Sequence, residues 1–361
     1  MKKKFFYIFI IYFFIGFSSF SQNQTLSSWK ILENAQLKFD SGNYGESLNL
    51  ANKALNQRKY EVNSEYNILD IAITPAQVRR AGEDIKEVLN VLVEREQKDA
   101  VSVIEKYLKL YGNDFFDNNI HNLVNWLKNK AVYPEADYLI GQIYQMEGEF
   151  NTAVNFYNKA YSEKEYLDIP DIEFDILYSL AYLYKINDDL DKFEKTLLLI
   201  LDDDSYFKNE LLKSSVLRNI DLDRAENVDR LFYLYRAESK YSLKALYELS
   251  FIYESRDDED KALVCSALAA IEAFTHIFNT IIEHDSRFVY TDLKMFLVEC
   301  SKYEEIVNWG RNNNVWESFY LFAERAGKHG KLVFAQELYL VLSQSIPDEY
   351  YRALCAKRII N

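Results

Sequence analysis

Proline and glycine are scarce in this sequence, which holds only 4 prolines and 10 glycines among 361 residues. Short strands joined by tight turns need many of these residues, so their scarcity excludes a fold built from numerous β-hairpins. Hydrophobic residues make up 49% of the chain and charged residues 27%, which is enough apolar surface to bury a large core. An all-α fold is therefore predicted.

Residues that carry chemistry are also sparse. The three cysteines, Cys265, Cys300 and Cys355, are scattered and form no CxxC pair, so neither a zinc site nor a disulfide framework is predicted. We expect buried free thiols, with a single disulfide as the alternative. Of the 4 histidines, no two have ligand spacing, and His276 lies among apolar residues, which favours a place in the core or at its boundary.

Motifs for nucleotide or acyl chemistry are missing as well. The sequence has no phosphate-binding loop, no GxSxG elbow and no glycine-rich dinucleotide turn. Its runs of aspartate do not follow the order of a calcium loop, and they fall where interhelix turns and helix N-termini are expected, so we interpret them as caps. We expect a non-enzymatic protein with no metal and no cofactor.

Positive charge is in short supply. The chain has 42 lysines and arginines against 56 acids, for a formal net charge of −14. Nucleic acid is not an expected partner, because binding phosphates requires clustered basic residues. Anionic lipid would repel the chain, whereas a basic protein partner would be attracted to it.

The first residues are read separately. Lys2, Lys3 and Lys4 precede an apolar run from Phe5 to Phe17, and Ser19-Phe20-Ser21 supplies small residues at a cleavage site. This pattern predicts a signal peptide over 1–21, cleaved after Ser21, with an uncleaved membrane anchor as the alternative. No later apolar run is expected to span a membrane.

Small residues and aromatics recur at helical spacing in the rest of the chain. In the stretch "YPEADYLIGQIYQMEGEFNTAVNFYNKA", Gly141 and Ala153 are placed where two helices cross, and Gly148 is placed in the turn between them. The spacing resembles the tetratricopeptide repeat (TPR), a helix-turn-helix of 34 residues. Related spacings occur near 28–60, 134–167, 174–207, 243–276 and 316–349.

Other segments have the apolar periodicity of helices without the full repeat signature. These are 74–96, 98–112, 114–130, 205–220, 228–237 and 290–310. Because the intervals between the recognised repeats are near multiples of the repeat length, we predict one TPR-like α-solenoid of antiparallel helical hairpins over 22–361.

The TPR resemblance also implies a binding groove. In TPR proteins the first helix of each hairpin lines the inner surface, and the fifth residue of four matched units is a tyrosine here: Tyr138, Tyr178, Tyr247 and Tyr320. Tyr182 and Phe251 join the same face. Such rings suit protein or peptide capture; the alternative is that some of them pack between hairpins.

Together these patterns predict an exported, non-enzymatic TPR scaffold that mediates protein assembly in the bacterial periplasm. The leader, the composition and the phrasing of "EADYLIGQIYQMEGEF" resemble periplasmic TPR proteins that build collars around flagellar motors. Its partners are expected to be envelope proteins with apolar anchors and basic flanks. The alternatives are an envelope adaptor for peptide or glycan ligands, and an accessory subunit of a cell-wall enzyme.

Overall fold

The computed structural model describes residues 26–67, 131–221, 227–237 and 241–359. Within these residues every regular element is a helix, which confirms the all-α prediction. The predicted signal peptide and the helices expected over 74–96, 98–112 and 114–130 lie outside the described residues. The chain divides into two compact units, 1–173 and 174–361, so the single array over 22–361 remains a prediction.

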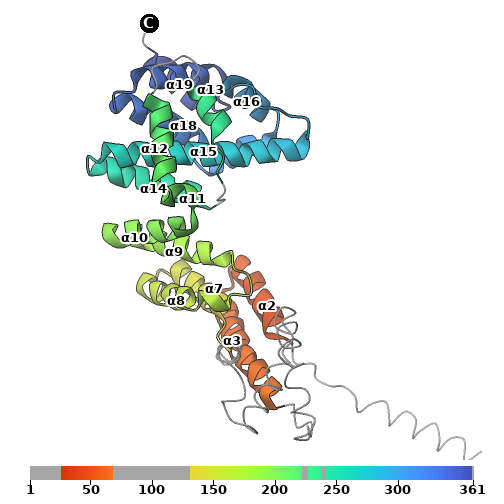
Figure 1. Ribbon diagram of the computed structural model, residues 1–361. Coiled ribbons are helices and arrows are strands. Elements are labelled where there is room, and N and C mark those ends of the chain that lie inside the picture. Colours follow the sequence, from red (N-terminus) through yellow and green to blue (C-terminus); the bar gives the residue numbers. More distant parts are fainter. Residues whose placement is uncertain (1–25, 68–130, 222–226, 238–240, 360–361) are drawn as a thin grey trace, which may run out of the picture. The chain divides into compact units, whose positions relative to one another are not determined.

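In unit 1, two helical hairpins form the described part (Figure 1). They comprise α2 (Ser28–Asp40), α3 (Tyr44–Asn67), α7 (Pro134–Met146) and α8 (Phe150–Ser162), followed by the short η2 (Lys164–Tyr166). The second helix of the first hairpin, α3, packs against the first helix of the next, α7. The buried core shared by α2, α3 and α7 consists of Ala35, Ala51, Leu139, Ile140 and Ile143.

In unit 2, the elements are α9 (Ile172–Ile186), α10 (Leu190–Ile200), η3 (Leu201–Asp203), α11 (Ser205–Lys208), α12 (Glu210–Asp221), α13 (Asn227–Leu234), α14 (Ser242–Ser255), α15 (Glu259–His284), α16 (Leu293–Cys300), α17 (Glu304–Asn312), α18 (Val315–Lys328), α19 (Leu332–Ser345) and α20 (Glu349–Arg358). As in unit 1, the second helix of a hairpin packs on the first helix of the next hairpin: α10 packs on α14, and α15 packs on α18. In Figure 1, α14 and α18 lie on opposite sides of α15.

Five hairpins share one turn geometry. The residue two positions before each second helix has a left-handed backbone: Gly42, Gly148, Asp188, Asp257 and Gly330, with φ between 57° and 83°. The next residue then donates its N–H to the carbonyl five positions earlier, as Glu149 does to Tyr144 at 2.8 Å and Asp258 to Tyr253 at 2.9 Å. This is the Schellman type of helix ending, in which glycine is favoured. One local device therefore closes hairpins in both units.

Close helix approach follows from the small residues at the crossings. A Cβ atom on Gly141 would lie 2.5 Å from Cε1 of Tyr157, whose side chain is fully buried. Ala153 and Ala160 of α8 are fully buried as well. The predicted crossing role of Gly141 is therefore seen directly, with the Tyr157 ring as the group that needs the space.

The aspartates at the turns cap helices. Asp189, Asp204 and Asp258 each accept a hydrogen bond from a backbone N–H in the first turn of the helix that follows, at 3.3, 2.9 and 3.3 Å. These contacts satisfy N–H groups that lack a partner inside the helix. The interpretation of these acidic runs as caps is confirmed at all three positions.

The helix α15 differs from what the sequence predicted in its apolar length and in where it ends. It is long and apolar enough, by length and composition, to cross a membrane, although 78% of its apolar window is buried in the protein. The expectation that no later run has this property was wrong, and the burial is that of a core helix. With 26 residues it also continues to His284, past the boundary at 276 suggested by the repeat, because no glycine or proline interrupts it.

The cysteines lie in the helical core. Cys265, Cys300 and Cys355 are all buried free thiols, as expected. Burial raises the pKa of the Cys265 thiol to about 12, so the thiolate, the reactive form, is strongly disfavoured.

Candidate functional site

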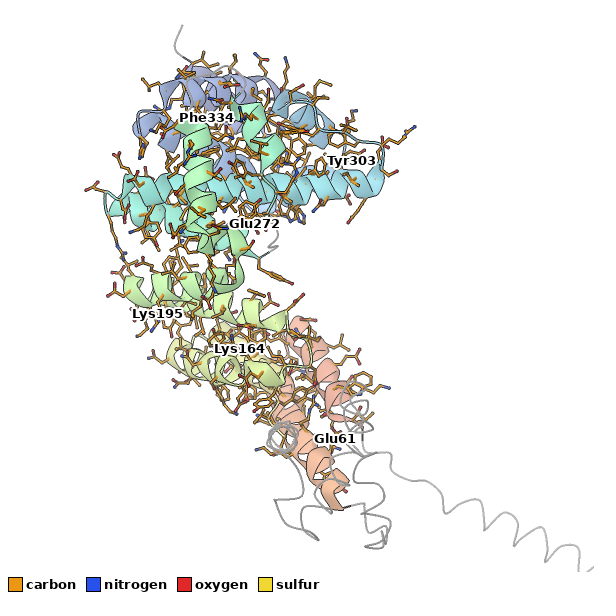
Figure 2. All side chains as sticks on the ribbon, in the orientation of Figure 1. Glu61, Lys164, Lys195, Glu272, Tyr303 and Phe334 are labelled. Atoms are coloured by element: carbon orange, nitrogen blue, oxygen red, sulfur yellow. The ribbon has the colours of Figure 1, made fainter. Side chains whose placement is uncertain are left out.

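A polar stripe runs along the second half of α15. Its members are Glu272, Thr275, His276, Asn279, Thr280 and Glu283, whose spacing of three and four residues places them on one face of the helix. The first four line a cleft of about 860 Å³, called here the α15 cleft. Glu272 is labelled in Figure 2 near the middle of α15, at the edge of the helix away from Phe334 of α19.

Two other parts of unit 2 complete the lining of the α15 cleft. The first, at α9 and the start of α14, contributes Tyr178, Tyr241, Lys244, Tyr247 and Glu248. The second, at the end of α17 and the connection to α18, contributes Trp309, Asn312, Asn313 and Asn314. The cleft therefore combines aromatic rings with amide side chains, and it holds one lysine and two glutamates.

The tyrosines are held in place by hydrogen bonds to neighbouring elements. The Tyr178 hydroxyl donates to the carbonyl of Tyr241 and accepts from the N–H of Ala245 at 3.2 Å, which ties α9 to the first turn of α14. The Tyr247 hydroxyl donates to Oε2 of Glu317 at 2.9 Å. These contacts leave the ring edges and faces, rather than free hydroxyls, as the groups offered to a ligand.

Glu272 is the most deeply buried acid of the α15 cleft, with 4% of its surface exposed. Desolvation, together with the nearby Asp204 carboxylate, raises the pKa of its carboxyl group to about 8, although hydrogen bonds from the N–H groups of Leu243 and Ser242 act in the opposite direction. Its Oε2 atom has no hydrogen-bond partner. A buried carboxylate oxygen without a hydrogen-bond partner is costly.

His276 and Trp309 form the rim between the α15 cleft and a second hollow of about 260 Å³, to which both residues also contribute. Their rings are stacked, with centroids 3.9 Å apart and planes 20° apart. The helix that carries Trp309 lies very close to α18, because a Cβ atom on Gly310 would meet the buried Trp316 ring at 2.3 Å. His276 is thus an exposed rim residue, not one in the core.

Two polar side chains of the cleft, Thr275 and Glu248, are already engaged by neighbouring groups. The Thr275 hydroxyl donates to the carbonyl of Ile271 at 2.7 Å and accepts from the N–H of Ala237 at 3.0 Å, so it is not poised as a nucleophile. Among the described residues, no group of three or more metal-ligating side chains occurs. Glu248 is paired with Lys185 at 2.7 Å, so Glu272 is the acid of the cleft lining that retains an unpartnered oxygen.

The structure brings together only part of the predicted tyrosine groove. Tyr178 and Tyr247 line the α15 cleft. Tyr182 and Phe251 are exposed at 51% and 37% but do not line it. Tyr320 is 9% exposed and packs against Tyr339 and Tyr351 of the C-terminal helices.

The remaining predicted groove residue belongs to unit 1. Tyr138 is half-buried and packs against Tyr157, with centroids 5.5 Å apart. For Tyr138 and Tyr320, the structure therefore favours the alternative of packing between helices. The binding role of Tyr178, Tyr182, Tyr247 and Phe251 stays a prediction.

Sequence reasoning missed most of the cleft. Glu272, Trp309, Asn279 and the run Asn312 to Asn314 were not singled out, and His276 was placed in the core or at its boundary. One signal was present: polar residues recur at helical spacing from Glu272 to Glu283 within an otherwise apolar helix. A polar stripe on such a helix indicates a face that does not pack on the core.

Comparisons with known proteins give relatives but no family. No family model matches the chain. It is 29% identical over 332 residues to an uncharacterized protein of Treponema pallidum, covering 91% of this chain and 89% of that one. It is 25% identical over 232 residues to an uncharacterized protein of Borreliella burgdorferi, covering 58% of this chain and 71% of that one. The first similarity spans nearly the whole of both chains.

Proposed function

We propose that the protein is a non-enzymatic helical-repeat scaffold of the TPR type, which binds a polypeptide segment of a partner in the α15 cleft. The observation that carries this proposal is the lining of the cleft, where tyrosine and tryptophan rings stand beside asparagine side chains on rigid helices. The shared turn of five hairpins, and the packing of second helices on following first helices, support the TPR assignment.

The chemistry of the lining suits a peptide. Asparagine side chains both donate and accept, so Asn279 and Asn312 match the N–H and C=O groups of an extended backbone. The rings of Tyr247 and Trp309 offer apolar faces at low entropic cost, as is usual where a few aromatic anchors dominate an interface. The acidic chain favours a partner segment with basic residues.

The compartment and the assembly are finer parts of the proposal. The leader over 1–21 supports export to the bacterial periplasm, and the two relatives are bacterial. Within that compartment, we propose that the partner belongs to the collar around the flagellar motor, because the sequence resembles collar proteins of the TPR type.

Affinity capture from the envelope fraction, followed by quantitative mass spectrometry, tests the proposal. The full chain and its Trp309→Ala variant would be compared, with Tyr182→Ala as the matched control because Tyr182 is an exposed aromatic that does not line the cleft. Truncation of a central aromatic in an interface typically costs at least about 2 kcal/mol, or roughly thirtyfold in affinity.

The proposal expects a partner that is recovered with the wild type and with Tyr182→Ala, and that is lost with Trp309→Ala. Motor components among the recovered proteins would support the collar. Equal recovery with all three chains would show that the cleft does not hold the partner. Recovery of soluble metabolite-processing enzymes alone would contradict the assembly role.

A further inference from the structure

Glu272 is an unusual residue to find in a peptide-binding cleft. It is only 4% exposed and it lines the α15 cleft. Its Oε2 atom accepts no hydrogen bond. The rest of the side chain is engaged, because its carboxylate accepts from the N–H groups of Ser242 and Leu243 at the start of α14. When Glu272 is ionised, this unsatisfied oxygen calls for a hydrogen-bond donor.

We infer that the α15 cleft contains a subsite for a cationic side chain of the partner segment, an arginine or a lysine, whose N–H groups are accepted by Oε2 of Glu272. This inference rests on the proposed function, since it names which residue of the bound polypeptide the cleft selects. The orphan oxygen supplies the acceptor, and the tyrosines around it supply the faces that a cation needs.

The surroundings support a charged donor. Lys244 places its Nζ atom 5.1 Å from the centre of the Tyr178 ring, within the range of a cation–π contact. The cleft therefore already holds a cation against the Tyr178 ring. The lining has one lysine against two glutamates, of which Glu248 is paired with Lys185. Glu272 is therefore the acid of the lining whose carboxylate is left for a cation of the partner.

Ionised partners also form the stronger bond. A hydrogen bond between a carboxylate and a guanidinium or ammonium group is roughly twice as strong as one between neutral groups. A glycan hydroxyl would fill the same position with a weaker bond, and a metal ion would need further oxygen ligands that the described residues do not gather here. The cationic side chain is the occupant that the geometry and the charge favour.

The test uses two blocked pentapeptides, Gly-Leu-Arg-Leu-Gly and its citrulline counterpart, which is neutral but nearly the same shape. Binding to the purified full chain is measured by calorimetry at pH 8. The wild type is expected to bind the arginine peptide at least about tenfold more tightly than the citrulline peptide. Because Glu272 must ionise to pair, this preference is expected to grow from pH 6 to pH 8.

Two matched variants separate the roles of the acids. Glu272→Gln keeps an oxygen for the N–H groups of Ser242 and Leu243 and should reduce the preference to about twofold or less. Glu299→Gln removes a carboxylate that is paired with Lys302 outside the cleft lining, and should leave the preference unchanged. Circular dichroism establishes that both variants fold.

Three results would overturn the subsite. These are equal affinity for the two peptides, a preference that survives Glu272→Gln, and no saturable binding of the arginine peptide up to about 10 mM. A tetramer of N-acetylglucosamine that binds more tightly than the peptide, and depends on Glu272, would assign the position to a hydroxyl donor. The proposed function fails separately, when Trp309→Ala still captures the envelope partner whatever the peptides show.

Discussion

The imidazole of His276 lies flat against the indole of Trp309, with ring centroids 3.9 Å apart. The two residues are 33 positions apart in the sequence and come from α15 and α17. Their stack forms the rim shared by the α15 cleft and the smaller hollow. The charge of this shared rim depends on the protonation of His276.

Because the imidazole of His276 is stacked on Trp309, the pKa of His276 reports whether this stack is formed. Partial desolvation lowers the pKa below its ordinary value of 6.5, and the nearby Glu283 carboxylate opposes the shift. The indole covers one face of the imidazole, so Trp309→Ala should expose the ring and return its pKa toward 6.5. A titration followed by NMR would measure both values. A higher pKa in the wild type than in the variant would contradict the stacked arrangement.

Glu272 should make the stability of the protein depend on pH. Its folded pKa of about 8 lies above the ordinary 4.5, so the folded state binds more protons than the unfolded state between these values, and stability falls as pH rises through this window. Glu272→Gln removes the titration. Between pH 5 and pH 8, the free energy of unfolding of the variant should therefore rise relative to that of the wild type. The rise should be at most about 5 kcal/mol, since one pKa unit is worth about 1.4 kcal/mol.

Urea unfolding at several pH values measures this difference, and Glu248→Gln is the control because its carboxylate is paired and less buried. A constant difference between Glu272→Gln and the wild type across the range would show that Glu272 does not titrate as a buried acid.

The crossing of α7 and α8 should be intolerant of one methyl group. Gly141→Ala places a carbon 2.5 Å from the ring of Tyr157, which is fully buried and cannot swing away. Overpacking should outweigh the gain in helix propensity and lower the free energy of unfolding by about 2 kcal/mol. Gly45→Ala is the control, because nothing lies within 4 Å of its Cβ position. It should stabilise α3 by up to about 1 kcal/mol, and equal effects of the two changes would refute the crossing.

The hairpin turn at Asp257 should accept glycine and reject a branched side chain. Its φ of 58° lies in the same left-handed region as the φ of 76° to 83° of Gly42, Gly148 and Gly330 at three of the other turns. Asp257→Gly is expected to change the free energy of unfolding by less than about 0.5 kcal/mol, because relief of the left-handed strain offsets the added freedom of the unfolded chain. Asp257→Val should lower it by about 2 kcal/mol. Thermal melts of the two variants provide the comparison, and equal melting temperatures would contradict the shared turn.

Local chemistry made much of the fold predictable. The turn glycines Gly148 and Gly330, the crossing glycine Gly141 and the capping aspartates act through the backbone next to them, so their roles can be read from neighbouring residues. The length of α15 was harder to predict from the sequence. The repeat pattern ends it at 276, whereas the helix continues to His284. No glycine or proline interrupts it, and His284 contacts Tyr303 and Glu305 at the start of α17.

The candidate site depends on such distant contacts. Trp309 and His276 meet only because α17 packs closely on α18 through Gly310 and Trp316, and nothing local indicates this pairing. Tyr320 shows the opposite case: its position in the repeat suggested a groove, but α20 brings Tyr351 against it. Spacing identifies the face of a helix, and the neighbouring helix decides whether that face is open.

A photo-crosslinking amino acid in place of Asn279, an exposed residue of the α15 cleft, tests the central claim most directly. In cells that make the full chain, irradiation should join this position to one envelope polypeptide, identified by mass spectrometry. The same amino acid at Leu211, which is 84% exposed outside the cleft lining, is the control and should give little of that product. Crosslinking from position 211 and none from position 279 would contradict a scaffold that holds its partner in the α15 cleft.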